Sequence, residues 1–135
     1  MIALDTNVLI YACDRSSPDR QREASGLIER ATNCVLLWQV ACAFVAASRK
    51  LASHGFTPSD AWNRLTEFQA LFPLVQPGPG VLQHARDLHL TRGVSFWDAM
   101  ILAACVDARV DTLYSEDIPG VALSSPKVVN PLTVK

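Results

Sequence analysis

The chain begins with MIALDTNVLIYACD (residues 1–14), where one acidic residue interrupts an apolar run. Residues 2–4 predict a short buried strand, and residues 6–13, which include Val8, Leu9 and Ile10, predict a helix directly after it. Asp5 stands between the two elements. Because a carboxylate in apolar surroundings is costly unless something pairs with it, the stretch raises the question of what Asp5 faces.

Short apolar runs and helical segments continue to alternate along the chain. We expect strands at residues 2–4, 34–38, 74–76, 112–114 and 127–129, and helices at residues 6–13, 16–31, 39–53, 57–72, 81–90 and 95–108. Residues 39–53 are apolar nearly all round, which predicts a central helix. This alternation is typical of an α/β fold with a mostly parallel sheet.

Length and composition predict one folded domain over residues 1–135. Half of the residues are hydrophobic and 19% are charged, which excludes a disordered chain. A net charge of −1 excludes a protein that coats nucleic acid by charge alone. An active site for nucleic acid remains compatible with this charge, because it needs only a local basic rim.

The cysteines predict a reduced, cytoplasmic protein. Cys13, Cys34, Cys42 and Cys105 have no CxxC spacing and lie in apolar stretches, so we expect all four in the core. The N-terminus lacks the basic region of a signal peptide, and the longest apolar stretch, residues 34–48, is too short to span a bilayer. We therefore expect no membrane association.

Three acidic positions are predicted to meet at one edge of the sheet. Asp5 follows the first strand, Asp117 follows the strand at residues 112–114, and Asp98 opens a helix whose next turns are apolar. Ligands of parallel sheets bind beyond the carboxyl ends of the strands. Each acid also has a plain structural interpretation: Asp5 as a helix cap, Asp117 as a turn residue, and Asp98 as the partner of Ser95 in a capping box.

The combination of the three acids favours a metal site. At an effective dielectric constant near 20, two carboxylates about 5 Å apart repel each other by roughly 3 kcal/mol. A hard divalent cation such as Mg²⁺ or Mn²⁺ takes oxygen ligands and removes this repulsion. Such a cation also activates water and stabilises charge on a phosphoryl oxygen. The predicted chemistry is phosphodiester hydrolysis.

Four stretches resemble the PIN-domain ribonucleases of the VapC-like toxin kind, which occur in bacterial toxin–antitoxin pairs. They are ALDTNVLIYA (3–12), WQVACAFVAASRK (38–50), SFWDAMILAAC (95–105), and LYSEDI with VVNPL (113–118 and 128–132). The resemblance covers nearly the whole chain. It implies a three-layer PIN-like α/β fold, in which a mostly parallel sheet of short strands is flanked by helices.

The resemblance also implies roles for individual residues and for partners. By position, Asp5, Asp98 and Asp117 match the family's metal-binding and catalytic acids. The supporting positions, with Glu116 as an assisting acid, are Thr6, Asn7, Ser115 and Glu116. The family further implies Mg²⁺ or Mn²⁺ as cofactor, RNA as substrate, a small antitoxin protein as partner, and a homodimer.

One position departs from the family's pattern. Its members usually carry a glutamate in a Q-V-x-x-E-F motif, and this chain has Ala43 at that place between Gln39 and Phe44. Three interpretations stay open. The site works with three acids, or it is weakened and the protein mainly binds RNA or an antitoxin, or the alanine is a substitution that lowers toxicity.

One other enzyme class shares part of this pattern, and four aromatic or imidazole side chains have plainer interpretations. A phosphatase of the haloacid-dehalogenase type also places an aspartate after its first strand, but it expects a second one where Asn7 stands. Trp97 precedes Asp98 and could stack on a base, although packing in an apolar helix is the better expectation. The three histidines, His54, His84 and His89, are expected on the surface.

Overall fold

A computed structural model describes residues 1–118 and 125–132 of the chain. In this part of the chain a five-stranded sheet has the strand order β3-β2-β1-β4-β5, and every neighbouring pair is parallel. The strands are β1 (Ile2–Leu4), β2 (Cys34–Leu37), β3 (Leu74–Val75), β4 (Thr112–Tyr114) and β5 (Lys127–Val129). The prediction of an α/β fold with a parallel sheet is confirmed.

The strand order reverses at β1, which lies at the centre of the sheet. The chain moves from β1 outward through β2 and β3, and it then returns to place β4 on the other side of β1. Ile2 accordingly pairs with Cys34 on one side and with Thr112 on the other. Such a reversal opens a crevice beyond the carboxyl ends of the two strands that flank it. Here that crevice lies beyond β1 and β4.

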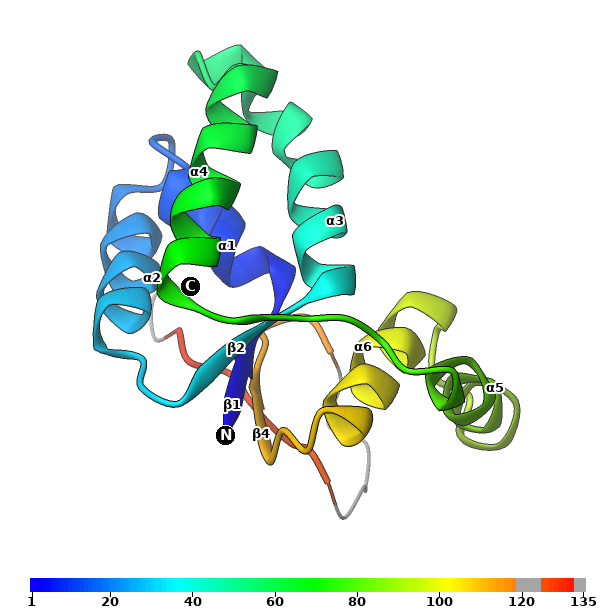
Figure 1. The fold of residues 1–135 in the computed structure, drawn as a ribbon. Helices are drawn as coiled ribbons and strands as arrows, with labels where there is room; N and C mark the ends of the chain where they lie inside the picture. Colours follow the sequence, from blue (N-terminus) through cyan, green and yellow to red (C-terminus); the bar gives the residue numbers. More distant parts are fainter. Residues whose placement is uncertain (119–124, 133–135) are drawn as a thin grey trace.

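Helices pack in two groups around this sheet (Figure 1). In the first group α1 contacts α2 and α3, and α3 contacts α4; in the second, α5 packs along α6. α6 also contacts α3 and β2, so it joins the two groups. The helices are α1 (Thr6–Cys13), α2 (Pro18–Arg30), α3 (Trp38–Ala47), α4 (Pro58–Leu71), α5 (Gly80–Arg92) and α6 (Phe96–Asp107), and a 3-10 helix, η1 (Ser48–His54), follows α3.

α6 is enclosed by the core along its middle turns. Its buried residues are Ala99, Ile101, Leu102, Ala103, Ala104 and Cys105. Because these side chains cover most of its circumference, the helix has little freedom to rotate or slide. The first turn of α6, which carries Asp98, is therefore held at a fixed place relative to the sheet.

The predicted helix at residues 39–53 differs from the observed structure in two ways. The helical backbone begins one residue earlier, at Trp38, because Leu37 is extended and ends β2. It also changes from α to 3-10 geometry at Ser48, whose hydroxyl donates a hydrogen bond to the Val45 carbonyl at 2.8 Å. A serine that bonds back to its own helix competes with regular helical hydrogen bonding.

The expectation of four core cysteines is also corrected, because α3, which contacts α1, α4, α6 and β2 as a central helix does, leaves one of its faces exposed. α3 buries Gln39, Val40, Ala41 and Phe44, whereas Cys42 is exposed. The apolar face that includes Cys42 lines a groove instead of packing in the core. The other three cysteines are buried, and burial raises the pKa of Cys34 and Cys105 to about 12. These two thiols are therefore protonated at neutral pH.

No helix in the described ranges, residues 1–118 and 125–132, is long and apolar enough to cross a membrane.

Candidate functional site

Asp5 is held in place by the end of β1 and the start of α1. It is the N-cap residue of α1, and its Oδ1 accepts a hydrogen bond from the Thr6 amide at 2.7 Å. Its own amide donates to the Tyr114 carbonyl of β4 at 2.9 Å, which extends the sheet by one bond. The cap expected from the sequence is thus present. It occupies one carboxylate oxygen and leaves the other to a different partner.

That partner is Ser115, the first residue after β4. The Ser115 hydroxyl donates to Asp5 Oδ2 at 2.6 Å, and it accepts from the Ile118 amide at 3.2 Å. Ser115 is 2% exposed and Asp5 is 9% exposed, so bulk water has little access to this contact. The bond ties the loop after β4 to the end of β1. Asp5 therefore cannot change its orientation without moving that loop.

The pKa of Asp5 is raised above its ordinary value of 3.8, and the main cause is burial. The hydrogen bonds from Ser115 and Thr6 favour the charged form and oppose the rise. The negative charges of Asp98 and Asp117 raise the pKa of Asp5 further. Asp98 and Asp117 therefore both lie close enough for their charges to act on Asp5.

The Asp98 carboxylate accepts no hydrogen bond from the described residues, whereas the carboxylate of the matching residue in α4 does. In α4 the capping box is complete, because Thr57 Oγ1 accepts from the Asp60 amide and Asp60 Oδ2 accepts from the Thr57 amide. In α6 the Ser95 hydroxyl accepts from the Asp98 amide at 3.4 Å, and the reciprocal bond is not made. Capping therefore explains the Asp60 carboxylate and does not explain that of Asp98.

Asp5, Asp98 and Asp117 line one cavity of about 220 Å³, which we call the acidic cavity. Thr6 and Asn7 line it from the first turn of α1. The acids reach it from three separate places: the end of β1, the start of α6 and the loop after β4. The cavity lies where the strand order reverses, as parallel sheets place their ligands.

Ala43 also lines the acidic cavity, from α3. A glutamate at this position would start from a backbone that already faces the three acids. The departure from the family's motif therefore removes a carboxylate from the site itself and not from a distant surface.

Two amide side chains at the acidic cavity are buried without a hydrogen-bond partner among the described residues. They are Asn7, in which both amide atoms are unpaired, and Gln39, which is 9% exposed and unpaired in the same way. An unpaired buried polar group costs about 1–3 kcal/mol. The sequence had assigned Asn7 a supporting role but had given Gln39 none. The sequence feature that could have indicated Gln39 as a site residue is that it is a polar amide in an otherwise apolar helical stretch.

Glu116 has a different environment from its neighbour Asp117. Its Oε1 lies 3.6 Å from Arg20 of α2, and Arg20 also donates to the Tyr11 hydroxyl at 2.6 Å. Glu116 does not line the acidic cavity, and its Oε2 is buried without a partner in the described part of the chain. The structure thus places Glu116 in a contact that ties the loop after β4 to α2.

The donor set of the acidic cavity fits Mg²⁺ or Mn²⁺ in its chemistry. Carboxylate and amide oxygens are the ligands these hard cations take, and a cation would stabilise the charged form of Asp5 against burial and against the smaller repulsion from Asp98 and Asp117. Within residues 1–118 and 125–132, however, no three His, Cys, Asp or Glu side chains are already arranged to hold a metal ion. Asp117 is exposed on its loop.

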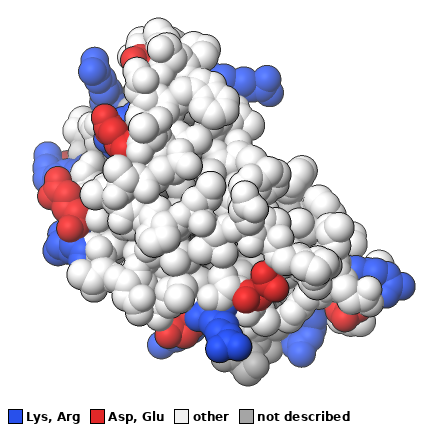
Figure 2. Space-filling model, in the orientation of Figure 1, with Lys and Arg blue, Asp and Glu red and all other residues white. Residues whose placement is uncertain are grey.

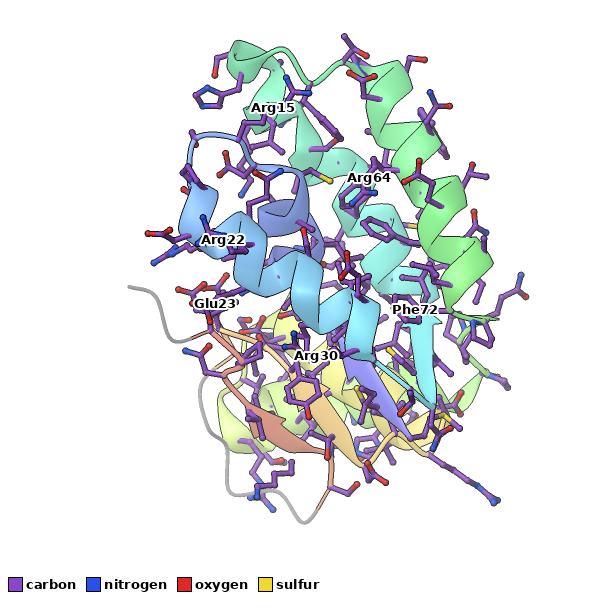
Figure 3. All side chains as sticks on the ribbon, turned by 90° about the vertical axis from the view of Figure 1, so that its left-hand side faces the viewer. Arg15, Arg22, Glu23, Arg30, Arg64 and Phe72 are labelled. Atoms are coloured by element: carbon purple, nitrogen blue, oxygen red, sulfur yellow. The ribbon has the colours of Figure 1, made fainter. Side chains whose placement is uncertain are left out.

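Two basic residues line the spaces next to the acidic cavity. Lys50 lines a cavity of about 280 Å³ that also contains Thr6, Asn7 and Asp117, and Arg49 and Lys50 both line the groove next to α3. Arg15 and Arg22 lie on the face drawn in Figure 3, and neither lines the acidic cavity. The face in Figure 2 shows charges scattered around its margin, in keeping with the net charge of −1.

Trp97 does not pack in the core, which corrects the expectation from the sequence. Its side chain is 74% exposed, although Asp98 and Ala99 follow it in an otherwise buried helix. Trp97 lines both the acidic cavity and a groove of about 790 Å³ between α3 and α6. The surface position of the histidines is closer to expectation, because His54 and His89 are exposed and His84 is partly exposed.

Two solved structures share this fold. One is a chain of a toxin–antitoxin complex from Klebsiella pneumoniae, with a TM-score of 0.73, 18% identity, and coverage of 99% of this chain and 100% of that chain. The other belongs to VapBC2 from Rickettsia felis bound to a DNA fragment from its promoter, with a TM-score of 0.60, 16% identity, and coverage of 85% and 87%. At these identities the likeness establishes the fold.

Comparison with curated protein sequences gives no match. The family model described as PIN domain, in contrast, matches residues 2–118, which include Asp5, Asp98 and Asp117. This match decides against the haloacid-dehalogenase alternative. The chain belongs to the PIN domain family.

Proposed function

We propose that this protein is a metal-dependent endoribonuclease that acts as the toxin of a toxin–antitoxin pair. The observation that carries the proposal is the convergence of Asp5, Asp98 and Asp117 on one cavity at the reversal point of a PIN-domain sheet. Asp98 and Asp117 lie 93 and 112 residues after Asp5 in the sequence. Helix capping does not explain the orientation of the Asp98 carboxylate. A shared function at the cavity explains why the fold tolerates their repulsion.

Each acid has a distinct task in this proposal. Asp5 is the fixed ligand, because the Thr6 amide and the Ser115 hydroxyl hold its two oxygens. Asp98 is the second fixed ligand, because the enclosed helix α6 holds its backbone. Asp117 is the adjustable one, since it lies exposed on a loop and completes the set when it turns inward.

Mg²⁺ or Mn²⁺ bound by these acids would supply the activation of water and the neutralisation of charge on the phosphoryl group. The protein's own contribution is positioning. Lys50, beside Asp117 and Asn7, is placed to bind a neighbouring phosphate of the strand. The unpaired Asn7 amide offers a donor and an acceptor to the substrate within the acidic cavity.

The toxin assignment rests on the likeness of the fold to chains of toxin–antitoxin complexes. The partners in this proposal are a small antitoxin protein and a second copy of the chain in a homodimer, and the compartment is the cytoplasm.

A second candidate function is binding without cleavage. The observation that favours it is Ala43, which faces the acidic cavity at the place where a further carboxylate would stand. With one ligand fewer the cation would be held more weakly. In this case the protein would bind RNA or an antitoxin partner and would cut little or nothing.

The deciding experiment is cleavage of a labelled total-RNA pool in Mg²⁺ or Mn²⁺, with and without chelator. We expect cleavage that chelator stops and that Asp5→Asn and Asp98→Asn abolish. Asp60→Asn is the matched control, because Asp60 holds the equivalent position of another helix and belongs to a closed capping box. Equal activity of Asp98→Asn and Asp60→Asn contradicts the proposed site.

Ala43→Glu separates the two candidate functions. If the natural chain cuts RNA, three acids suffice. If only Ala43→Glu cuts, the site is a nuclease site that lacks one ligand, and binding is the function of the natural chain. Absence of metal-dependent cleavage from both proteins contradicts the ribonuclease assignment.

A further inference from the structure

The loop after β4 is anchored on both sides of Asp117. On one side the Ser115 hydroxyl donates to Asp5 Oδ2 at 2.6 Å, which joins the loop to the end of β1. On the other side the Ile118 amide donates to the Ser115 hydroxyl at 3.2 Å, and the Ile118 side chain is buried in the core. Between these two anchors lie Asp117 and one other residue. The surroundings of that residue therefore help to decide where Asp117 stands.

That other residue is Glu116, and its carboxylate faces Arg20 of α2. Glu116 Oε1 lies 3.6 Å from Arg20 Nη2, and both side chains are partly buried. Glu116 Oε2 is buried and has no hydrogen-bond partner among the described residues. Because a buried charge is costly without a charge of opposite sign beside it, the inward position of Glu116 depends on Arg20. Without Arg20 we expect the Glu116 side chain to turn toward water, and the loop at Asp117 to shift with it.

Arg20 is itself held in place by Tyr11 of α1. It donates to the Tyr11 hydroxyl at 2.6 Å, and its guanidinium carbon lies 4.9 Å from the centroid of the Tyr11 ring. A guanidinium that is both stacked and hydrogen-bonded has its planar group oriented in advance. Tyr11 belongs to the helix that Asp5 caps, and it shares a cavity of about 280 Å³ with Asp117. Arg20 thus links the loop after β4 to the helix that begins next to Asp5.

We propose that Arg20 is a positioning residue, which holds Asp117 within reach of a metal ion in the acidic cavity through its ion pair with Glu116. The proposal rests on the metal-dependent function proposed above, and it extends the site to a residue of α2. Neither Arg20 nor Glu116 lines the acidic cavity, so neither is assigned a contact with the ion. Residues that hold a metal ligand in place typically change metal affinity or activity by about 10–100-fold when they are replaced.

The direction of the change in metal affinity separates positioning from a simple effect of charge. Arg20 is positive, so if only its charge acted on the site, its removal would make a cation bind more tightly. If Arg20 instead positions Asp117, its removal loosens a ligand and the cation binds more weakly. Replacing Glu116 does not separate the two explanations by itself, because loss of its negative charge and loss of the ion pair both weaken cation binding.

The test is a titration of Mn²⁺ into the metal-free protein without RNA, in which electron paramagnetic resonance measures the free Mn²⁺. We expect Arg20→Met to raise the Kd for Mn²⁺ about tenfold. Arg20→Lys keeps the charge and loses the planar group that stacks on Tyr11, so it should raise the Kd by a smaller factor. Arg20→Lys decides the question if Arg20→Met does not fold. Arg20→Met combined with Glu116→Gln should raise the Kd by less than the product of the two single effects, because the two residues form one pair.

Arg64→Met is the matched control, because Arg64 makes contacts of the same kind on α4. Its Nη1 lies 2.6 Å from Glu67 Oε2, and its guanidinium carbon lies 4.8 Å from the centroid of the Phe68 ring. Neither Arg64 nor Glu67 lines the acidic cavity. We expect Arg64→Met to bind Mn²⁺ with the Kd of the unaltered chain. Melting temperatures of both variants in chelator measure any loss of stability separately from metal affinity.

Equal Mn²⁺ affinities of Arg20→Met and Arg64→Met overturn the proposal, and so does tighter binding by Arg20→Met. If Arg20→Met binds Mn²⁺ more tightly while Glu116→Gln binds it more weakly, Glu116 is itself a ligand and the positioning role is wrong.

The titration also separates this proposal from the proposed function. Mn²⁺ binding that Arg20→Met weakens, without cleavage of RNA by the unaltered chain, refutes only the ribonuclease function. Metal-dependent cleavage together with an unchanged Mn²⁺ affinity of Arg20→Met refutes only the positioning role. An unaltered chain that binds no Mn²⁺ refutes both.

Discussion

Replacing Ser115 with alanine removes two hydrogen bonds from the buried edge of the acidic cavity. The hydroxyl donates to the Asp5 carboxylate at 2.6 Å and accepts from the Ile118 amide at 3.2 Å. A hydrogen bond to a charged group contributes about 1.5–3 kcal/mol and a neutral one about 0.5–1.5 kcal/mol. We therefore expect Ser115→Ala to lower the free energy of unfolding by about 2–4.5 kcal/mol at neutral pH.

The loss should depend on pH, with a sign fixed by Asp5. Burial holds the folded-state pKa of Asp5 above 3.8, and the Ser115 bond lowers that pKa, so the alanine variant has a still higher one. At pH values above the folded-state pKa, the buried charge of Asp5 lowers the free energy of unfolding, and it lowers it more in Ser115→Ala. As the pH falls through the raised pKa values toward 3.8, Asp5 becomes protonated in the folded state. The difference in free energy of unfolding between the unaltered chain and Ser115→Ala then becomes smaller.

Urea unfolding in the presence of chelator, at neutral and at mildly acid pH, measures this difference in free energy of unfolding. Ser48→Ala is the control, because Ser48 is 4% exposed and its hydroxyl donates to an uncharged carbonyl, that of Val45, at 2.8 Å. Its loss should be about 0.5–1.5 kcal/mol and independent of pH. A loss for Ser115→Ala no greater than that of Ser48→Ala, or one that does not change with pH, refutes the reasoning.

Further substitutions test the site and the fold separately. Asp5→Asn removes a desolvated, repelled charge, so without metal it should raise the melting temperature at neutral pH; a lower melting temperature contradicts this. Ala43→Glu should lower the metal-free melting temperature, and Mn²⁺ at a hundredfold excess over its Kd should return about 2.7 kcal/mol. If Mn²⁺ changes the melting temperature of the unaltered chain and of Ala43→Glu equally, position 43 has no role in metal binding. Thr57→Ala opens the capping box of α4 and should cost about 1 kcal/mol in urea unfolding, with RNA cleavage unchanged.

The sequence was sufficient for the sheet and its helices because the pattern is local. All four residues of β2 and all three of β1 are apolar, so neither strand has a polar face. Such a pattern is typical of a strand in a sheet that is covered on both sides. What local pattern could not indicate is the end of regular α geometry at Ser48, since this depends on which carbonyl the hydroxyl bonds. It also could not show that α3 leaves Cys42 exposed beside a groove, because this depends on which of the described segments pack against that face.

For the site, the convergence of Asp5 and Asp117 follows from the rule for strand ends, but the direction of individual side chains does not. Asp98 and Asp60 occupy the same position after a hydroxyl N-cap, and only the folded structure shows that one carboxylate closes the box while the other stays free. Glu116 and Asp117 are neighbours in the sequence, yet only Asp117 lines the acidic cavity.

The bond between Asp5 and Ser115 joins residues that are 110 positions apart. Of the strands in this sheet, the central one is thus synthesised first, and its neighbour β4 follows only after the nine elements from α1 to α6. A growing chain cannot contain the acidic cavity before Asp117 has left the ribosome. Pairings of such long separation are also the slow ones in folding. The proposed enzyme therefore acquires its active site only once β4 and the loop after it have joined β1, and a chain broken off inside β4 has none.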